Sequence, residues 1–193
     1  ARPFITHHNT LDIDMYMRIA TELNLKRLIV GGMDRVYEIG RIFRNEGMDP
    51  KHNPEFTTVE LYQAYADFND MMDLFEELLS SAAKELLGSY ELQWQGEKLN
   101  LAPGWPRLTM HEAVKQYVGI DFMAIDSDEA AVAAAKAVGV EIPEGKDRTW
   151  GNALYECFDQ KVEEQLVQPT FITMHPVDVS PLAKRSAKDP RLT

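Results

Sequence analysis

Residues Phe43–Tyr65 read FRNEGMDPKHNPEFTTVELYQAY, and this stretch decides the fold. It joins two apolar-rich runs, Val36–Arg44 and Thr57–Ala66, through a loop that contains two prolines and a glycine. Such a loop between two apolar runs predicts antiparallel strands joined by a long turn. The loop and its edges hold many ionisable side chains: Arg44, Glu46, Lys51, His52 and Glu55. A turn that only connects two strands needs far fewer ionisable side chains, so we expect this hairpin to contain a binding or catalytic site.

The second strand of this hairpin places a carboxylate and a phenol on one face. Side chains alternate along a strand, so Glu60 and Tyr62 point one way, while Val59, Leu61 and Tyr65 point the other. An unpaired carboxylate on a buried strand would cost several kcal/mol, which favours a cation site beside Glu60.

Arg44 ends the first strand and offers a planar guanidinium suited to a carboxylate or a phosphate. One hairpin therefore predicts both an anion site and a cation site. A basic amino acid joined to a nucleotide phosphate would need both.

Composition limits the possible partners. The chain has 193 residues, of which 45% are hydrophobic, enough for about one domain. Its net charge of −11 disfavours a broad nucleic-acid-binding face and favours a small cationic substrate. One cysteine, Cys157, excludes an internal disulfide and is typical of a reducing compartment. No apolar run is long enough to span a membrane, so we expect a soluble, cytoplasmic protein without a membrane partner.

The rest of the chain predicts helices and short strands. We expect strands at Pro3–Thr6, Met15–Ala20, Thr170–Thr173 and Val177–Val179, a polar turn at His7–Asn9, and a hairpin over Tyr90–Leu101. We expect helices from Thr21 to Gly31, from an Asn69 cap to Gly88, over Ser127–Val138 and over Trp150–Leu166. The Asn69 helix carries one apolar stripe, formed by Met71, Phe75, Leu78, Leu79, Ala82 and Leu86. Thr109 and Glu112 have the spacing of a capping box.

This pattern predicts an α+β fold, an antiparallel sheet flanked by helices. Residues 105–167 read as a helical insertion within a single domain that covers residues 1–193. His7 and His8 invite a metal assignment, but neither Cys157 nor nearby acids complete a tetrahedral set. We therefore predict no metal site within the chain.

The sequence FRNEG, then HNPEFT, then ELYQAYAD resembles the second signature motif of class II aminoacyl-tRNA synthetases. The ELYQAYAD continuation resembles the lysine-specific synthetases of bacterial type. The resemblance extends from ARPFITHHN at the start to PTFITMHPVDVSPLAKR near the end. It implies the catalytic α+β fold of that class, incomplete here. It also implies a ligase that activates lysine with ATP and transfers it to tRNA(Lys).

The resemblance also implies roles for individual residues. Arg44 would be catalytic, touching both the α-phosphate of ATP and the lysine carboxylate. Lysine would be bound by Glu22, Arg44, Glu60 and Tyr62. ATP would be bound by Arg44, Glu46, His52, Asn53 and Phe56.

Each role has a structural alternative. Arg44 could be an exposed arginine paired with Glu46 or Glu60, and Glu22 a first-turn carboxylate favoured by the helix dipole. Phe56 could be a buried hinge aromatic and His52 a solvated loop residue.

Several parts of the family's machinery do not occur in these residues. The resemblance places the first and third signature motifs, the magnesium ligands and the anticodon-binding domain outside the 193 residues. We therefore expect a central piece of a homodimeric enzyme that uses Mg²⁺ in its full-length form, inactive by itself. Two alternatives remain open: a paralogue that attaches a lysine derivative to elongation factor P, or a non-catalytic remnant of a synthetase.

Overall fold

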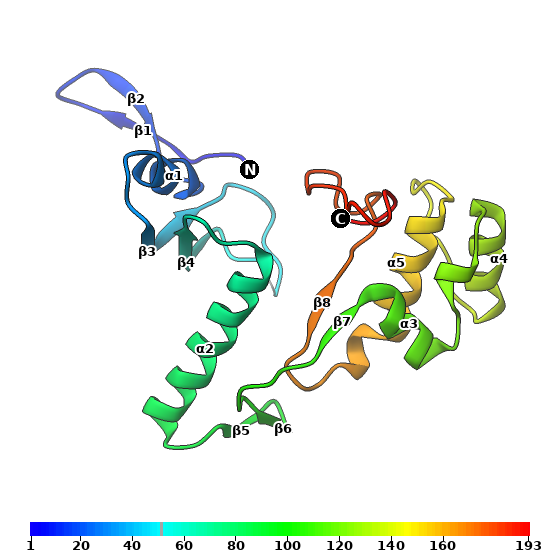
Figure 1. The fold of residues 1–193 in the computed structure, drawn as a ribbon. Coiled ribbons are helices and arrows are strands. Elements are labelled where there is room, and N and C mark those ends of the chain that lie inside the picture. Colours follow the sequence, from blue (N-terminus) through cyan, green and yellow to red (C-terminus); the bar gives the residue numbers. More distant parts are fainter. Residues whose placement is uncertain (51) are drawn as a thin grey trace. The chain divides into compact units, whose positions relative to one another are not determined.

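A computed structural model describes residues 1–50 and 52–193; Lys51, one of the ionisable loop residues, lies outside the described part. The chain is an α+β protein that divides into two compact units, Ala1–Met71 and Met72–Thr193 (Figure 1). We call them the N-terminal unit and the C-terminal unit and describe each by itself. Helix α2 (Phe68–Leu87) contains the boundary between them.

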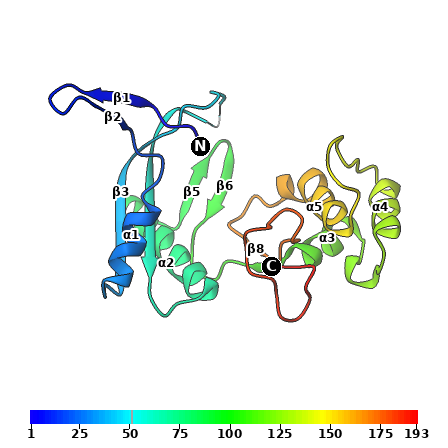
Figure 2. The same ribbon diagram turned by 90° about the horizontal axis from the view of Figure 1, so that it is seen from above.

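The N-terminal unit consists of two hairpins and one helix. Strands β1 (Ile5–His8) and β2 (Ile13–Tyr16) form the first hairpin, and helix α1 (Glu22–Val30) follows it. Strands β3 (Arg35–Phe43) and β4 (Glu55–Gln63) form the second, with two long antiparallel arms (Figure 2). The strongest sequence prediction, a long-loop hairpin around FRNEG, is therefore confirmed.

The β3–β4 hairpin has two different faces. The facing pairs on one side are Val36–Tyr62, Glu38–Glu60, Gly40–Thr58 and Ile42–Phe56, and α1 packs against the sheet on this side. We call this side the inner face. On the outer face Tyr37, Ile39 and Val59 are 72%, 65% and 51% exposed, whereas Ile42 on the inner face is 1% exposed. The hairpin therefore buries apolar side chains on its inner face and leaves those on its outer face exposed.

Helix α1 begins and ends where the sequence predicts. Thr21 occupies the N-cap position and Leu25 is buried, while Gly31 and Gly32 follow the last helical residue. Gly32 adopts a φ of +99°, a conformation that favours glycine. Thr21 makes no side-chain capping bond; its backbone has φ −107° and ψ −8° instead of the extended N-cap conformation, and its hydroxyl donates to Glu60.

The C-terminal unit contains most of the helices. After α2 come β5 (Glu91–Trp94) and β6 (Glu97–Asn100), then β7 (Arg107–Thr109), α3 (Met110–Val118) and a 3₁₀ turn, η1 (Phe122–Ala124). Helices α4 (Asp128–Ala137) and α5 (Trp150–Lys161), the 3₁₀ turn η2 (Glu163–Gln165) and β8 (Phe171–Thr173) complete it. The predicted capping box of Thr109 and Glu112 is present.

The sheet prediction needs a correction. Instead of one antiparallel sheet, the described residues form four two-stranded sheets, and β7 pairs with β8 in parallel. No strand forms at Val177–Val179, because its backbone follows turns there instead of pairing in a ladder. His7 and His8 belong to strand β1 instead of a turn, because each pairs across to β2. Tyr65 lies beyond β4 with a φ of +58°, so it is not on that strand.

Helix α2 was predicted with the wrong cap. Asp67 accepts the backbone N–H groups of Asn69 and Asp70, so the aspartate caps the helix. The predicted apolar stripe is also incomplete, because Leu86 is 81% exposed, while Ser80 and Ala83 are the buried residues of α2. Ser80 is accommodated by donating its hydroxyl to the Leu101 carbonyl oxygen at 2.6 Å.

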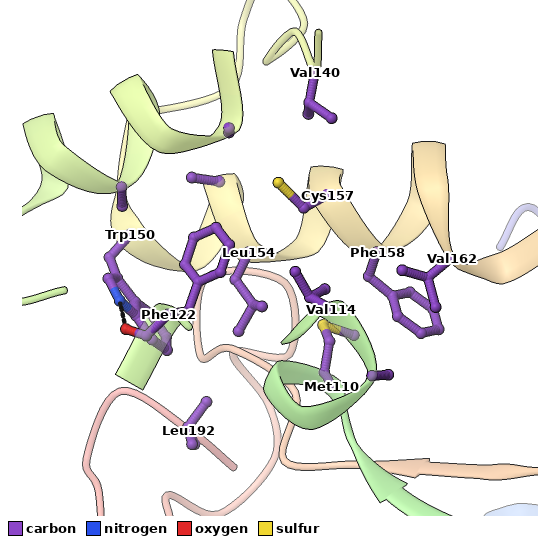
Figure 3. Packing of buried hydrophobic residues seen from close by; sticks show 14 residues of the cluster. Met110, Val114, Phe122, Val140, Trp150, Leu154, Cys157, Phe158, Val162 and Leu192 are labelled. Atoms are coloured by element: carbon purple, nitrogen blue, oxygen red, sulfur yellow. Dashed lines mark hydrogen bonds between the residues drawn. The ribbon is translucent and has the colours of Figure 1, made fainter. Parts of the chain in front are cut away.

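The core of the C-terminal unit lies between α3, α4 and α5 (Figure 3). Phe122 and Leu154 are fully buried, and the Trp150 indole N–H donates to the Phe122 carbonyl oxygen at 3.0 Å. Burial raises the pKa of the Cys157 thiol to about 11, with Glu156 adding to the shift. Cys157 is therefore a structural core residue.

None of the helices that the structure describes is long and apolar enough to cross a membrane. Within residues 1–50 and 52–193, no group of three or more His, Cys, Asp or Glu side chains is placed to hold a metal ion.

Candidate active site on the β3–β4 hairpin

Glu60, on the inner face of β4, is held by two hydroxyl groups. The Thr21 hydroxyl donates to one carboxylate oxygen at 2.7 Å, and the Tyr62 hydroxyl donates to the other at 2.6 Å. The sequence argument assumed an unpaired carboxylate on a buried strand. Glu60 is instead partly buried and hydrogen-bonded, which stabilises its ionised form.

These contacts shift two pKa values in opposite directions. The hydrogen bond from Tyr62, followed by that from Thr21, lowers the pKa of Glu60. Burial, followed by the bond to Glu60, raises the pKa of Tyr62 well above its ordinary value. Near neutral pH the pair is therefore an ionised carboxylate and a protonated phenol, a suitable acceptor set for an ammonium group.

Glu22 opens helix α1 next to Thr21. It forms an ion pair with Lys26 one turn later, and both side chains are exposed. The Lys26 ammonium also lies over the Tyr62 ring, 5.7 Å from its centroid. Glu22 thus stands at the same end of the inner face as Glu60 and Tyr62, already paired with a cation of its own helix.

Arg44 immediately follows β3 and is exposed. Its guanidinium lies over the Phe56 ring, 5.4 Å from the centroid, and its Nε is 3.5 Å from the Ile19 carbonyl oxygen. Among the described residues no carboxylate lies within ion-pair distance of Arg44, so the predicted alternative pairing with Glu46 or Glu60 is wrong. Its charge is therefore available to an anion.

The loop between the strands carries the other predicted ATP residues. His52 Nδ1 lies 2.8 Å from Asp49 Oδ2, and the Asn53 side-chain amide donates to the Glu55 carbonyl oxygen. Glu46 is exposed, its carboxylate 3.7 Å from the Ala1 amino group. The Arg44 N–H donates to the Pro54 carbonyl oxygen at 2.9 Å and closes the base of the loop.

Arg18, between β2 and α1, also contacts the inner face. It forms an ion pair with Glu38, and its Nε donates to the Arg41 carbonyl oxygen at 2.7 Å. A Cβ at Gly40 would overlap the Arg18 guanidinium, so glycine is required for this approach.

Comparisons with known proteins identify the family of the chain. A family profile described as "tRNA synthetases class II (D, K and N)" matches residues 1–193. The chain belongs to the class II tRNA synthetases. Lysine–tRNA ligase of Staphylococcus haemolyticus (strain JCSC1435) is 56% identical over all 193 residues, and that of Synechococcus sp. (strain RCC307) is 57% identical over 192. The chain spans 38% of the length of each of these two relatives.

Within this class II tRNA synthetase chain, all predicted site residues lie in the N-terminal unit. The structure brings Glu22, Glu60 and Tyr62 together around α1 and β4, and it brings Arg44 and Phe56 together at the other end of the hairpin. Glu46, His52 and Asn53 lie in the loop beyond that end. We call the Arg44 end of the inner face the anion end and the Glu60 end the cation end, after the charge that each would attract.

Sequence reasoning missed several residues of this site. Thr21 was predicted only as a helix cap, although its hydroxyl contacts Glu60. Lys26 could have been found, because Glu22 and Lys26 have the spacing of a helical ion pair. Arg18 and Glu38 are twenty positions apart in the chain and carried no such signal.

Proposed function

We propose that this chain forms the part of a lysine–tRNA ligase that activates lysine with ATP. In this reaction the lysine carboxylate attacks the α-phosphate of ATP, displacing pyrophosphate and leaving lysyl-adenylate, from which lysine passes to tRNA(Lys). The observation that carries the proposal is that Arg44 and Glu60 lie at opposite ends of the same face of one hairpin. Among the described residues, neither has an ion-pair partner.

The spacing of these two groups supports the proposal. Phe56, which stacks under Arg44, and Glu60 are four residues apart on β4, about 13 Å along the strand. Two long side chains reaching inward from such a separation can hold the two ends of one lysine molecule. Arg44 then aligns two anions that would otherwise repel, the carboxylate and the α-phosphate.

The cation end would recognise the lysine ammonium groups. Glu60 accepts a charge-assisted hydrogen bond while Tyr62 fixes its orientation, and Glu22 lies nearby for the second ammonium group. Since Tyr62 stays protonated, it adds no competing negative charge.

The anion end would bind ATP. Phe56 offers a ring face to adenine, His52 is oriented by Asp49 and leaves Nε2 for the triphosphate, and Glu46 and Asn53 are loop contacts for the nucleotide. Among the described residues no group of three or more His, Cys, Asp or Glu side chains is placed to hold a metal ion, and Mg²⁺ would be held by other parts of the full-length enzyme. A homodimeric, cytoplasmic enzyme, with residues 105–167 as an insertion in its catalytic domain, belongs to the same proposal.

A chimera tests this function. Residues 1–193 replace the matching segment of the Staphylococcus haemolyticus lysine–tRNA ligase. ATP–pyrophosphate exchange is then measured with each of the twenty amino acids, followed by charging of tRNA(Lys). We expect exchange that depends on lysine, and none from the 193-residue chain alone. No exchange by the chimera, or exchange driven by another amino acid, would contradict the proposal.

A further inference from the structure

Three carboxylates lie on or beside the inner face of the hairpin, and two of them are already neutralised. Glu22 is paired with Lys26, and Glu38 is paired with Arg18. Glu60 is held only by hydroxyl groups. Of these three carboxylates Glu60 is therefore the one without an ion-pair partner among the described residues, and Lys26 acts on it only from a longer distance.

Glu38 is the carboxylate that would compete with Glu60 for a ligand ammonium group. The two residues face each other directly in the antiparallel register. Directly opposite side chains have Cβ atoms about 4.5–5.5 Å apart, and like charges at such positions repel. Without a cation beside Glu38, a ligand ammonium would meet two equivalent acceptors instead of one.

Arg18 is fixed independently of Glu38. Its Nε donates to the Arg41 carbonyl oxygen, and its own carbonyl oxygen accepts the Phe43 N–H at 2.9 Å. Gly40 leaves the space that the guanidinium occupies. Three features of β3 thus hold one cation directly beside Glu38.

Stability does not explain this arrangement. The Arg18 and Glu38 side chains are 44% and 33% exposed. Ion pairs with this exposure contribute little to the free energy of folding. Their place opposite Glu60 makes a role in the charge of the site the better explanation.

We propose that Arg18 is a positioning residue whose ion pair with Glu38 leaves Glu60 as the single acceptor for the substrate ammonium group. This inference rests on the proposed function. The proposal predicts that the loss of either Arg18 or the Glu38 charge weakens ammonium binding at Glu60. Without Arg18, the unpaired Glu38 draws the ammonium away from Glu60. Without the Glu38 charge, the guanidinium of Arg18, still held at β3, acts on Glu60 across the strand pair and competes with the ammonium.

The test is a double-mutant cycle in the chimera, read by lysine-dependent pyrophosphate exchange. Arg18→Met and Glu38→Gln should each raise the KM for lysine by about tenfold, a loss of roughly 1.4 kcal/mol. The KM for ATP should change less than about threefold, because the anion end is untouched. The double variant should return the KM for lysine to within about threefold of the unmodified chimera, since neither free charge remains.

Arg41→Met is the matched control. It removes the same charge from the outer face, where Arg41 pairs with Glu55, and should leave the KM for lysine unchanged. Glu38→Gln keeps the shape of its side chain, so it remains informative if Arg18→Met does not fold.

Two results would overturn the inference: an unchanged lysine KM in Glu38→Gln, or a double variant as impaired as the worse single variant. The second result is what a purely structural role of Arg18 predicts. An unmodified chimera without lysine-dependent exchange is a different failure, because it removes the proposed function itself.

Discussion

The two units of this chain differ in how many apolar side chains they bury. The C-terminal unit has a core of fourteen buried residues that includes Met110, Phe122, Trp150 and Leu154. In the N-terminal unit the buried residues include Thr21, Leu25 and Ile42, and the side chains around them include a phenol, two partly buried carboxylates and an exposed guanidinium. Core packing therefore accounts for one unit, whereas the charged and hydrogen-bonded side chains of the other are those that the proposed ligand recognition requires.

The largest expected effect lies in the core of the C-terminal unit. Leu154→Ala in the 193-residue chain should lower the free energy of unfolding by about 2–5 kcal/mol, because it leaves a cavity at a fully buried site. Denaturant titration followed by tryptophan fluorescence measures it. Leu182→Ala is the matched control, since Leu182 lies in the same unit and is 100% exposed. A loss below about 1 kcal/mol in Leu154→Ala would contradict the importance of this core.

The next effect belongs to the anion end of the hairpin. Arg44→Ala in the chimera should reduce the exchange rate by about 10²–10³, by analogy with the loss of one preorganised charge-stabilising donor. Its stability should change by less than about 0.5 kcal/mol, because the side chain is exposed. Arg41→Ala, three residues earlier and on the outer face, is the control for exchange kinetics. A rate for Arg44→Ala within tenfold of the unmodified chimera would exclude a catalytic role.

Tyr62→Phe tests whether the Tyr62 hydroxyl controls lysine binding at the cation end of the hairpin. Removing the hydroxyl that lowers the pKa of Glu60 should cost about tenfold in kcat/KM for lysine, equal to the loss of one hydrogen bond to a charged group. Glu60 binds a cation only when ionised, so lysine binding is present above its pKa and is lost as the pH falls through it. Since the variant raises this pKa, the acid loss of kcat/KM should begin at a higher pH.

The pH dependence of lysine exchange, measured from neutral pH downward to below pH 4.5, the ordinary pKa of a glutamate, tests that direction. Tyr37→Phe removes a phenol hydroxyl from the exposed outer face and serves as the control. An acid limb that stays in place, or moves to lower pH, would show that Tyr62 does not set the ionisation of Glu60.

The smallest expected effect is on the outer face of the hairpin. Val59→Ala should change the unfolding free energy by less than about 0.5 kcal/mol, because half of the side chain is already exposed. Val114→Ala, the same substitution in the core, should cost clearly more. Equal losses measured by denaturant titration would remove the distinction between the two units.

The sequence predicted the elements best where local chemistry determines them. The FRNEG hairpin, the Thr109–Glu112 capping box and the glycines after α1 each depend on residues close in the chain. The pairing of β7 with β8 was missed, because about sixty residues separate these strands and each has only three residues. The Asp67 cap was missed because Asn69, two residues later, is equally suitable by residue type.

In the candidate site, too, the sequence predicted contacts between residues close in the chain and missed contacts between distant ones. Residue alternation predicted that Glu60 and Tyr62 share a face, and their hydrogen bond confirms it. The contact of Thr21 with Glu60 joins residues thirty-nine positions apart, and the Arg18–Glu38 pair joins residues twenty apart. Such contacts depend on how α1 packs on the hairpin, which no local pattern encodes.

The central claim is that one hairpin binds the two ends of lysyl-adenylate. A crystal structure of the chimera with a non-hydrolysable lysyl-adenylate analogue tests it most directly. We expect the side-chain ammonium within about 2.7–3.2 Å of Glu60 and Arg44 within the same distance of the oxygens that replace the α-phosphate. Analogue density away from the inner face, with Glu60 still bonded only to Thr21 and Tyr62 and Arg44 facing bulk water, would contradict the account.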